Sequence, residues 1–151
     1  YEDALKSYKQ GDYKTFLSIL EDLANKGDVE AQNELGYQYK SGDMLKQNYK
    51  KAVEWFEKSA NQGYAGAQYN LGSMYNDGYG VKQDIKKSFE LFEKAAKQGD
   101  KFAQVKLGAM YLFGQGVEQN SEKAKELLYK SCIGGVKTAC DYYIKLNEQW
   151  H

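Results

Sequence analysis

The feature that most constrains the fold of this chain is a repeat with a fixed spacing. The block AQNELGYQY begins at residue 31, AQYNLGSMY at 67 and AQVKLGAMY at 103, so the copies recur every 36 residues. A second shared block lies between them, as KAVEWFEKSANQG at 51–63, KSFELFEKAAKQG at 87–99 and KAKELLYKSCIGG at 123–135. A decayed fourth copy of the first block begins with ACDYYIKL at residue 139. A spacing of this size indicates stacked structural units.

Both blocks have the periodicity of amphipathic helices. In the first block, Ala67, Leu71 and Tyr75 lie four residues apart and therefore share one helix face. The chain contains no proline, and a glycine follows each block, where it favours the end of a helix. A short polar residue precedes each second block and predicts an N-cap: Asn48, Asp84 and Asn120. The sequence therefore predicts an all-α chain.

Small and apolar residues at equivalent positions indicate how the helices pack. A glycine inside a helix costs up to about 1 kcal/mol, so we expect a close helix approach at Gly36, Gly72 and Gly108. The predicted core residues are Leu35, Leu71, Leu107, Trp55, Phe56 and Phe92. Packing between repeats is expected of Tyr39, Tyr75 and Tyr111. Tyr37 and Tyr69 are expected to be free of that role.

The order L-G-x-x-Y, with alanine and an aromatic residue downstream, resembles the tetratricopeptide pattern, although the spacing is longer. The additional residues fall in the loops DGYGVKQD (77–84) and FGQGVEQN (113–120), where G-x-G-V resembles the Sel-one-like repeat (SLR) family. The resemblance covers residues 28–140. The first loop, SGDMLKQN, has Met44 where the others have Gly80 and Gly116, so we expect it to follow another path.

The resemblance implies an α-α superhelix, a solenoid of antiparallel helix pairs with about nine helices in a single domain over 1–151. We place a helical hairpin at 1–27, repeats at 28–63, 64–99 and 100–135, and a capping helix at 136–151. Members of the family generally serve as adaptors for protein complexes, and stacked repeats leave a long concave surface. We therefore predict a monomeric scaffold that binds a protein or peptide.

Composition and charge argue against other partners. The 151 residues are 42% hydrophobic and 28% charged, as in an ordinary globular domain. The 21 acidic residues balance 21 basic ones, and every basic residue is lysine. Without the planar fork of arginine and without excess positive charge, we expect no nucleic-acid binding. No apolar run approaches the roughly 20 residues of a membrane helix, so we expect no membrane insertion.

Enzyme motifs are absent from the sequence. The G-x-G loops lie between two helices, whereas a dinucleotide fingerprint follows a strand. No serine lies in S-x-x-K or G-x-S-x-G. The single histidine, His151, is the last residue, where it is either native or part of a purification tag. We therefore predict no catalytic residue, no metal site and no cofactor.

The two cysteines lie on either side of one predicted turn. Cys132 replaces Ala60 and Ala96 near the end of a second helix, and Cys140 begins the closing helix. Two thiols and one histidine are too few for a four-ligand zinc site, and the spacing is not C-x-x-C. The ends of antiparallel helices bring α carbons within about 6 Å, which favours a structural disulfide. Two free, buried thiols are the alternative.

The spacing C-x7-C also resembles the Helicobacter cysteine-rich proteins, a secreted branch of the SLR family in which each repeat carries such a pair. The resemblance implies a secreted or periplasmic protein whose signal peptide has been removed, with a cytoplasmic location as the alternative. Some members of that branch are described as penicillin-binding or weakly β-lactamase-active. A hydrolase of that kind is therefore the alternative function.

The predicted docking surface is the stripe that the L-G-x-x-Y residues leave free on the first helix of each repeat. In repeat one it comprises Glu30, Asn33, Tyr37 and Lys40, and in repeat two Gly66, Tyr69, Ser73, Asn76 and Asp77. In repeat three it is apolar and comprises Phe102, Val105, Ala109, Leu112 and Phe113. Either the closing helix, with Tyr142, Tyr143 and Leu146, covers this third stripe, or the stripe is an exposed binding hot spot.

Overall fold

The structure is a computed structural model that describes residues 1–149. The end of the predicted capping helix, Trp150 and His151, lies outside the described residues. Residues 1–149 contain helices and no strand, which confirms the predicted all-α fold. The nine helices found there are α1 Glu2–Lys9, α2 Tyr13–Asn25, α3 Val29–Ser41, α4 Tyr49–Asn61, α5 Ala65–Asp77, α6 Ile85–Lys97, α7 Lys101–Phe113, α8 Ser121–Ile133 and α9 Lys137–Gln149.

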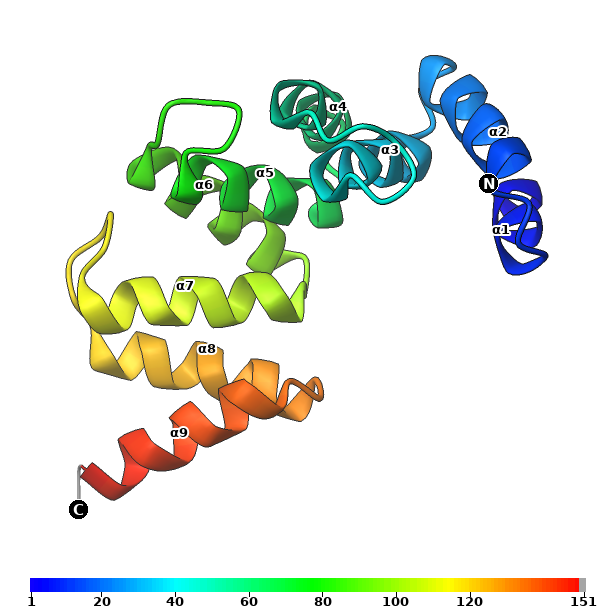
Figure 1. Ribbon diagram of the computed structural model, residues 1–151. Coiled ribbons are helices and arrows are strands. Elements are labelled where there is room, and N and C mark those ends of the chain that lie inside the picture. The colour runs from blue at the N-terminus through cyan, green and yellow to red at the C-terminus, as the bar shows by residue number, and fades with distance from the viewer. Residues whose placement is uncertain (150–151) are drawn as a thin grey trace.

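The helices are arranged as a solenoid. Each helix packs against the next one along the chain, and the pairs follow one another along an arc (Figure 1). The N-terminus and the end of α9 lie at opposite ends of this arc. Because no pair buries its apolar face alone, the core is a row of clusters rather than a single centre. None of these nine helices is both long and apolar enough to cross a membrane.

The predicted N-caps are confirmed. The side-chain oxygens of Asn48, Asp84 and Asn120 each accept a hydrogen bond of 3.0 Å from a backbone N–H three residues later. Each bond satisfies an amide that has no partner within the first turn, and losing such a cap costs about 1 kcal/mol. The six-residue loops before these caps therefore end at a defined residue in every repeat.

The glycines inside the first helices allow the close packing that was predicted. A Cβ atom on Gly36 would lie 2.7 Å from the ring of Phe56, and one on Gly72 would lie 2.9 Å from Phe92. The equivalent distance at Gly108, to Leu128, is 3.2 Å. These rings and the leucine occupy the space that the missing side chains leave, so the glycines serve packing.

Most of the predicted core residues are buried, with one exception. Leu35, Leu71, Leu107, Phe56 and Phe92 are buried as expected. Trp55 is only half-buried, which corrects its assignment to the core. The ammonium group of Lys58 lies 4.5 Å from the centre of its ring, so one face of the indole is directed towards a charged, solvated group.

The first loop follows a different path from its two counterparts, as predicted. Gly80 and Gly116 have φ values of 74° and 70°, a conformation that favours glycine, whereas Met44 has a negative φ. A Cβ atom on Gly80 would lie 2.5 Å from the carbonyl oxygen of Tyr49. The second loop therefore packs against the preceding repeat in a way that excludes a side chain.

Side-chain hydrogen bonds join the two helices of a pair. The amide Nε2 atoms of Gln62 and Gln98, at the ends of α4 and α6, donate to Gln32 on α3 and Gln68 on α5, at 2.8 Å in both cases. Gly134, at the equivalent position after α8, has no amide to donate. A disulfide between Cys132 and Cys140 connects α8 to α9, with 4.6 Å between the α carbons.

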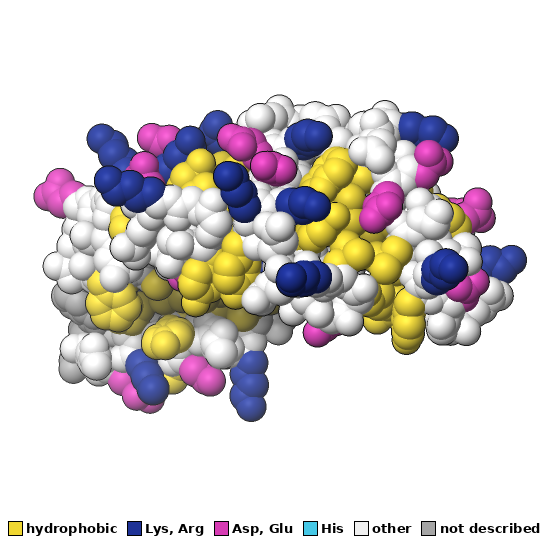
Figure 2. All heavy atoms as spheres, turned by 45° about the horizontal axis from the view of Figure 1, so that its top comes forward, with side chains coloured by type: hydrophobic (Ala, Val, Ile, Leu, Met, Phe, Trp, Pro, Cys, Tyr) yellow, Lys and Arg dark blue, Asp and Glu magenta, His cyan; other side chains and the backbone are white. Residues whose placement is uncertain are grey.

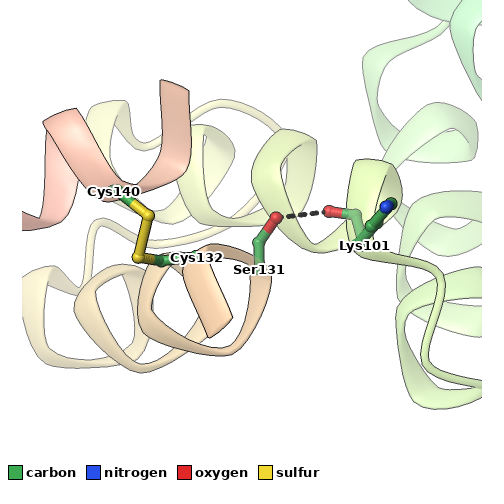
Figure 3. The surroundings of a disulfide bond; sticks show 4 residues. All are labelled: Lys101, Ser131, Cys132 and Cys140. Atoms are coloured by element: carbon green, nitrogen blue, oxygen red, sulfur yellow. Dashed lines mark hydrogen bonds between the residues drawn. A yellow bond between two sulfur atoms is a disulfide. The ribbon is translucent and has the colours of Figure 1, made fainter. Parts of the chain in front are cut away.

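The end of α8 is attached on both sides. Ser131 donates from Oγ to the carbonyl oxygen of Lys101 on α7 at 2.7 Å, while the next residue, Cys132, is bonded to α9 (Figure 3). Two adjacent side chains thus fix α8 to the helix before it and to the helix after it. The favoured structural disulfide is confirmed, and free thiols are excluded.

Candidate functional site

The predicted docking residues lie on α3, α5 and α7, the first helices of the three repeats. Two side-chain contacts connect these helices to one another. Asn70 donates from Nδ2 to Oδ1 of Asn33 at 2.9 Å, and the rings of Tyr69 and Phe102 lie with centroids 6.1 Å apart. We call the surface formed by the predicted stripes of α3, α5 and α7 the inner face. These contacts join α3 to α5 and α5 to α7.

Tyr69 has a packing role that was not expected. Its ring lies 5.7 Å from that of the buried Phe92 as well as against Phe102. Burial raises the pKa of the Tyr69 hydroxyl, while a hydrogen bond with Ser73 lowers it. The expectation that Tyr69 is free of packing is therefore wrong. Its ring supports Phe102 from beneath, since Phe102 itself remains 52% exposed.

The polar members of the stripe have mostly local partners. Asn76 donates to the carboxylate of Asp77 at 3.0 Å. The backbone carbonyls of Lys40 and Asn76 accept from Gln47 and Gln83, which fasten the ends of α3 and α5 to the loops that follow. Tyr37 is the aromatic member of the stripe in repeat one, and its side chain is 48% exposed.

The closing helix covers only part of the apolar stripe on α7. Val105 and Leu112 pack against the cluster formed by Leu128, Ala139 and Leu146. Phe102 and Phe113, near the two ends of α7, are 52% and 66% exposed. The closing helix therefore covers the middle of the stripe and leaves its two ends exposed. A shallow hollow of about 190 Å³ remains, the C-terminal hollow, lined by Val105, Lys106, Ala109, Leu112, Phe113, Leu128 and Tyr142.

A second hollow lies at the other end of the inner face. This N-terminal hollow measures about 340 Å³ and is lined by Tyr1, Leu5, Tyr8, Phe16, Glu34, Tyr37, Gln38, Asp43 and Met44. Of these residues only Tyr37 was predicted from the sequence to belong to a site. Gln38 has a signal that was overlooked, because the equivalent residues of the other repeats are the buried Met74 and Met110.

Two half-buried tyrosines lie close to carboxylates at the N-terminal end of the inner face. Burial, together with the nearby carboxylates of Glu34 and Glu30, raises the pKa of Tyr1 to about 12. Burial and Glu30 also raise the pKa of Tyr64. Burial is the larger cause of each pKa shift, and the carboxylates add to it.

Hydrophobic side chains occur on the surface in separate patches. Figure 2 shows these patches divided by lysine and carboxylate side chains, with a broad one in the half of the molecule that holds α1–α4. Apolar surface is therefore not confined to α7. Within residues 1–149, no three histidine, cysteine, aspartate or glutamate side chains lie close enough to share a metal ion.

The sequence of the three repeats identifies the class of protein. Residues 29–64, 65–100 and 101–136 each match the Sel1 repeat, and each match begins one residue after the boundary placed from the sequence. The chain therefore belongs to the Sel1 repeat family. Sel1 repeats generally form scaffolds for protein–protein interaction. No match was found among curated proteins.

Solved structures of bacterial proteins have the same fold. A Sel1 repeat protein from Oxalobacter formigenes is 39% identical over 85% of this chain and 97% of its own, with a TM-score of 0.77. A protective antigen of uropathogenic Escherichia coli strains, which displays an SLR fold, is 34% identical over 89% of this chain but only 30% of its own, with a TM-score of 0.84. Helicobacter pylori cysteine rich protein B is 26% identical over 82% and 93%, with a TM-score of 0.66.

Proposed function

We propose that this chain is a scaffold that binds an extended segment of another protein along the inner face. The observation that carries the proposal is the exposure of Phe102 and Phe113 at the two ends of one helix whose middle is covered. Large exposed apolar side chains beside a hollow are typical of binding surfaces, where aromatic residues contribute most of the affinity. Membership of the Sel1 repeat family supports the same function.

Within this proposal the residues have different roles. Phe102 and Phe113 are the apolar anchors, Val105 and Leu112 form the floor between them, and Tyr37 offers an aromatic surface at the other end. The polar residues between these ends fix the path of the bound segment by hydrogen bonds. The complete set of proposed contact residues is Asn33, Tyr37, Lys40, Tyr69, Ser73, Asn76, Phe102, Val105, Leu112 and Phe113.

The setting of the scaffold is also a proposal. We infer that the chain acts as one monomeric repeat domain and that it works outside the cytoplasm, in the periplasm or as a secreted protein. The disulfide between Cys132 and Cys140 supports this location, since such bonds persist in oxidising compartments. A cytoplasmic location is the alternative. The redox state of the two cysteines in cells distinguishes the two locations.

The decisive experiment compares a double surface substitution with a single control substitution in affinity capture from the native cell envelope. F102S combined with F113S removes both anchors, and we expect the captured partner to be lost with little change in melting temperature. I133S is the matched control, because Ile133 is 69% exposed and belongs to α8, which contributes no residue to the inner face. Capture that survives F102S with F113S, or that is lost equally in I133S, would exclude the inner face as the docking surface.

A penicillin-binding or β-lactamase-like hydrolase is the alternative function, and a nitrocefin assay separates it from the scaffold. We expect no hydrolysis above a buffer control. Saturable turnover that survives repurification, and that disappears when one serine or lysine is replaced, would favour the hydrolase.

A further inference from the structure

The N-terminal hollow differs from the rest of the inner face in the chemistry of its lining. Its walls are aromatic and its charged side chains are carboxylates, Glu34 on α3 and Asp43 in the loop that follows. None of the lining residues is a lysine. At the position of Glu34 the second and third repeats have Asn70 and Lys106, so this negative charge is particular to the first repeat.

Gln38 is a polar side chain at a position that the other repeats fill with methionine. It lines the hollow, only 5% of its surface is exposed, and its Nε2 donates to Oε1 of Glu34 at 2.7 Å. That bond fixes the orientation of the amide, and the Gln38 Oε1 atom is left without a hydrogen-bond partner. A buried acceptor without a partner is costly, and natural proteins contain few of them. A residue that lines the hollow thus has a buried amide oxygen without a donor.

Glu34 is a half-buried carboxylate that has no positive partner. The ion pairs found within residues 1–149 are Lys26–Asp22, Lys97–Glu93 and Lys130–Glu126. None of them involves Glu34 or Asp43. A carboxylate that loses part of its hydration without gaining a cation is stabilised when a ligand brings one.

We propose that the N-terminal hollow binds a lysine or arginine side chain of the protein segment that lies along the inner face. The positive head group donates hydrogen bonds to Glu34 and to the unpaired oxygen of Gln38. Its charge lies against the exposed rings of Tyr37 and Tyr8, which attract cations through their faces. The inference rests on the proposed function and gives the bound segment an orientation. A basic residue of that segment lies at α3, and an apolar residue of it lies at α7.

The test uses two short fluorescein-labelled peptides of equal length, titrated into the full chain and followed by fluorescence anisotropy. One peptide has two lysines at one end and Phe-Leu at the other, and the second has glutamates in place of the lysines. We expect the lysine peptide to bind more tightly, and its affinity to fall as salt concentration rises. We expect E34Q to weaken it by about tenfold, which is the effect of losing one charge-assisted hydrogen bond.

Three variants separate the site from general charge and folding effects. E54Q removes one negative charge from the exposed surface of α4, and we expect wild-type affinity from it. E34Q keeps an oxygen that accepts from Gln38, so an unchanged melting temperature shows that its fold is intact. Y37A provides a second test at an exposed side chain, and we expect it to weaken the lysine peptide while leaving the glutamate peptide unaffected.

Four results would overturn the proposal: equal binding of both peptides, no binding of the lysine peptide, equal losses in E34Q and E54Q, or self-association of the wild type that E34Q abolishes. The last result identifies a second copy of the chain as the occupant. The F102S and F113S pair keeps the two proposals distinct. If that pair weakens both peptides while E34Q has no effect, the scaffold function stands and the basic site is rejected.

Discussion

The first and third repeats share one framework and present opposite surfaces on it. Leu35 and Leu107 are equally buried, and Asn48 and Asn120 cap equivalent helices with bonds of the same length. On the inner face the two repeats differ completely, with carboxylates and tyrosines on α3 and phenylalanines on α7. In this solenoid, packing restricts the residue type at the positions that hold the helix pairs together. The residue types of the neighbouring stripe differ from one repeat to another.

The contacts at the ends of the second helices show a similar contrast. Between α3 and α4, and again between α5 and α6, an amide hydrogen bond joins two glutamines at equivalent positions. At the end of α8 this bond is missing, because Gly134 has no side chain to donate to Gln104, the equivalent residue on α7. The same end of α8 is instead bonded to α9 by the disulfide, so a covalent bond holds the closing helix in place.

The largest expected effect on stability comes from replacing a phenylalanine of the core, and the control replaces a phenylalanine of the exposed stripe. Phe56 is fully buried against Gly36, whereas Phe113 is 66% exposed. We expect F56A to lower the free energy of unfolding by about 3–5 kcal/mol, because it removes buried apolar surface and leaves a cavity. F113A is the matched control and should change it by less than about 0.5 kcal/mol. Urea denaturation followed by circular dichroism measures both, and comparable losses would show that Phe113 belongs to the core.

The disulfide at the last joint gives the next largest effect. Intact mass should show the oxidised chain two protons lighter than the reduced one, with Cys132 and Cys140 in one bridged peptide. Closing so short a loop contributes about 2–3 kcal/mol, so reduction should lower the melting temperature without unfolding the domain at room temperature. Two freely alkylated thiols in protein prepared from an oxidising compartment would contradict the pairing.

The residues that hold the helix pairs together were predictable because the same residue types recur at the same positions in every repeat. Three copies in register identify the caps, the packing glycines and the buried leucines, and the spacing of Cys132 and Cys140 relative to those copies locates both ends of one turn. Trp55 packs against the first core cluster but is only half-buried, and Lys58 lies over one face of its ring. A sequence pattern reports which face of a helix is apolar, but not how a neighbouring long side chain occupies it.

The candidate site was less predictable because it depends on features that do not repeat. The stripe on α7 was apolar in the sequence, yet only the placement of α9 decides that Val105 is covered and Phe102 is open. The N-terminal hollow is formed between α1 and α3, and α1 lies outside the clear repeats. Glu34 and Gln38 look like ordinary helix residues until the structure shows that the carboxylate has no positively charged partner and the amide oxygen has no donor.

The smallest expected effect concerns Gln38, where the first repeat departs from the other two. Q38M restores the methionine of Met74 and Met110 and removes the unpaired acceptor, so we expect a gain of about 1 kcal/mol in the free energy of unfolding. The same change should weaken the lysine peptide, because a donor entering the hollow then finds only Glu34. The reciprocal variant M74Q is the control. It buries an amide in the core of the second repeat and should lower the free energy of unfolding by about 1–3 kcal/mol. Stability that falls in Q38M would mean that the bond from Gln38 to Glu34 outweighs the unpaired oxygen, and the amide would then be structural rather than poised for a ligand.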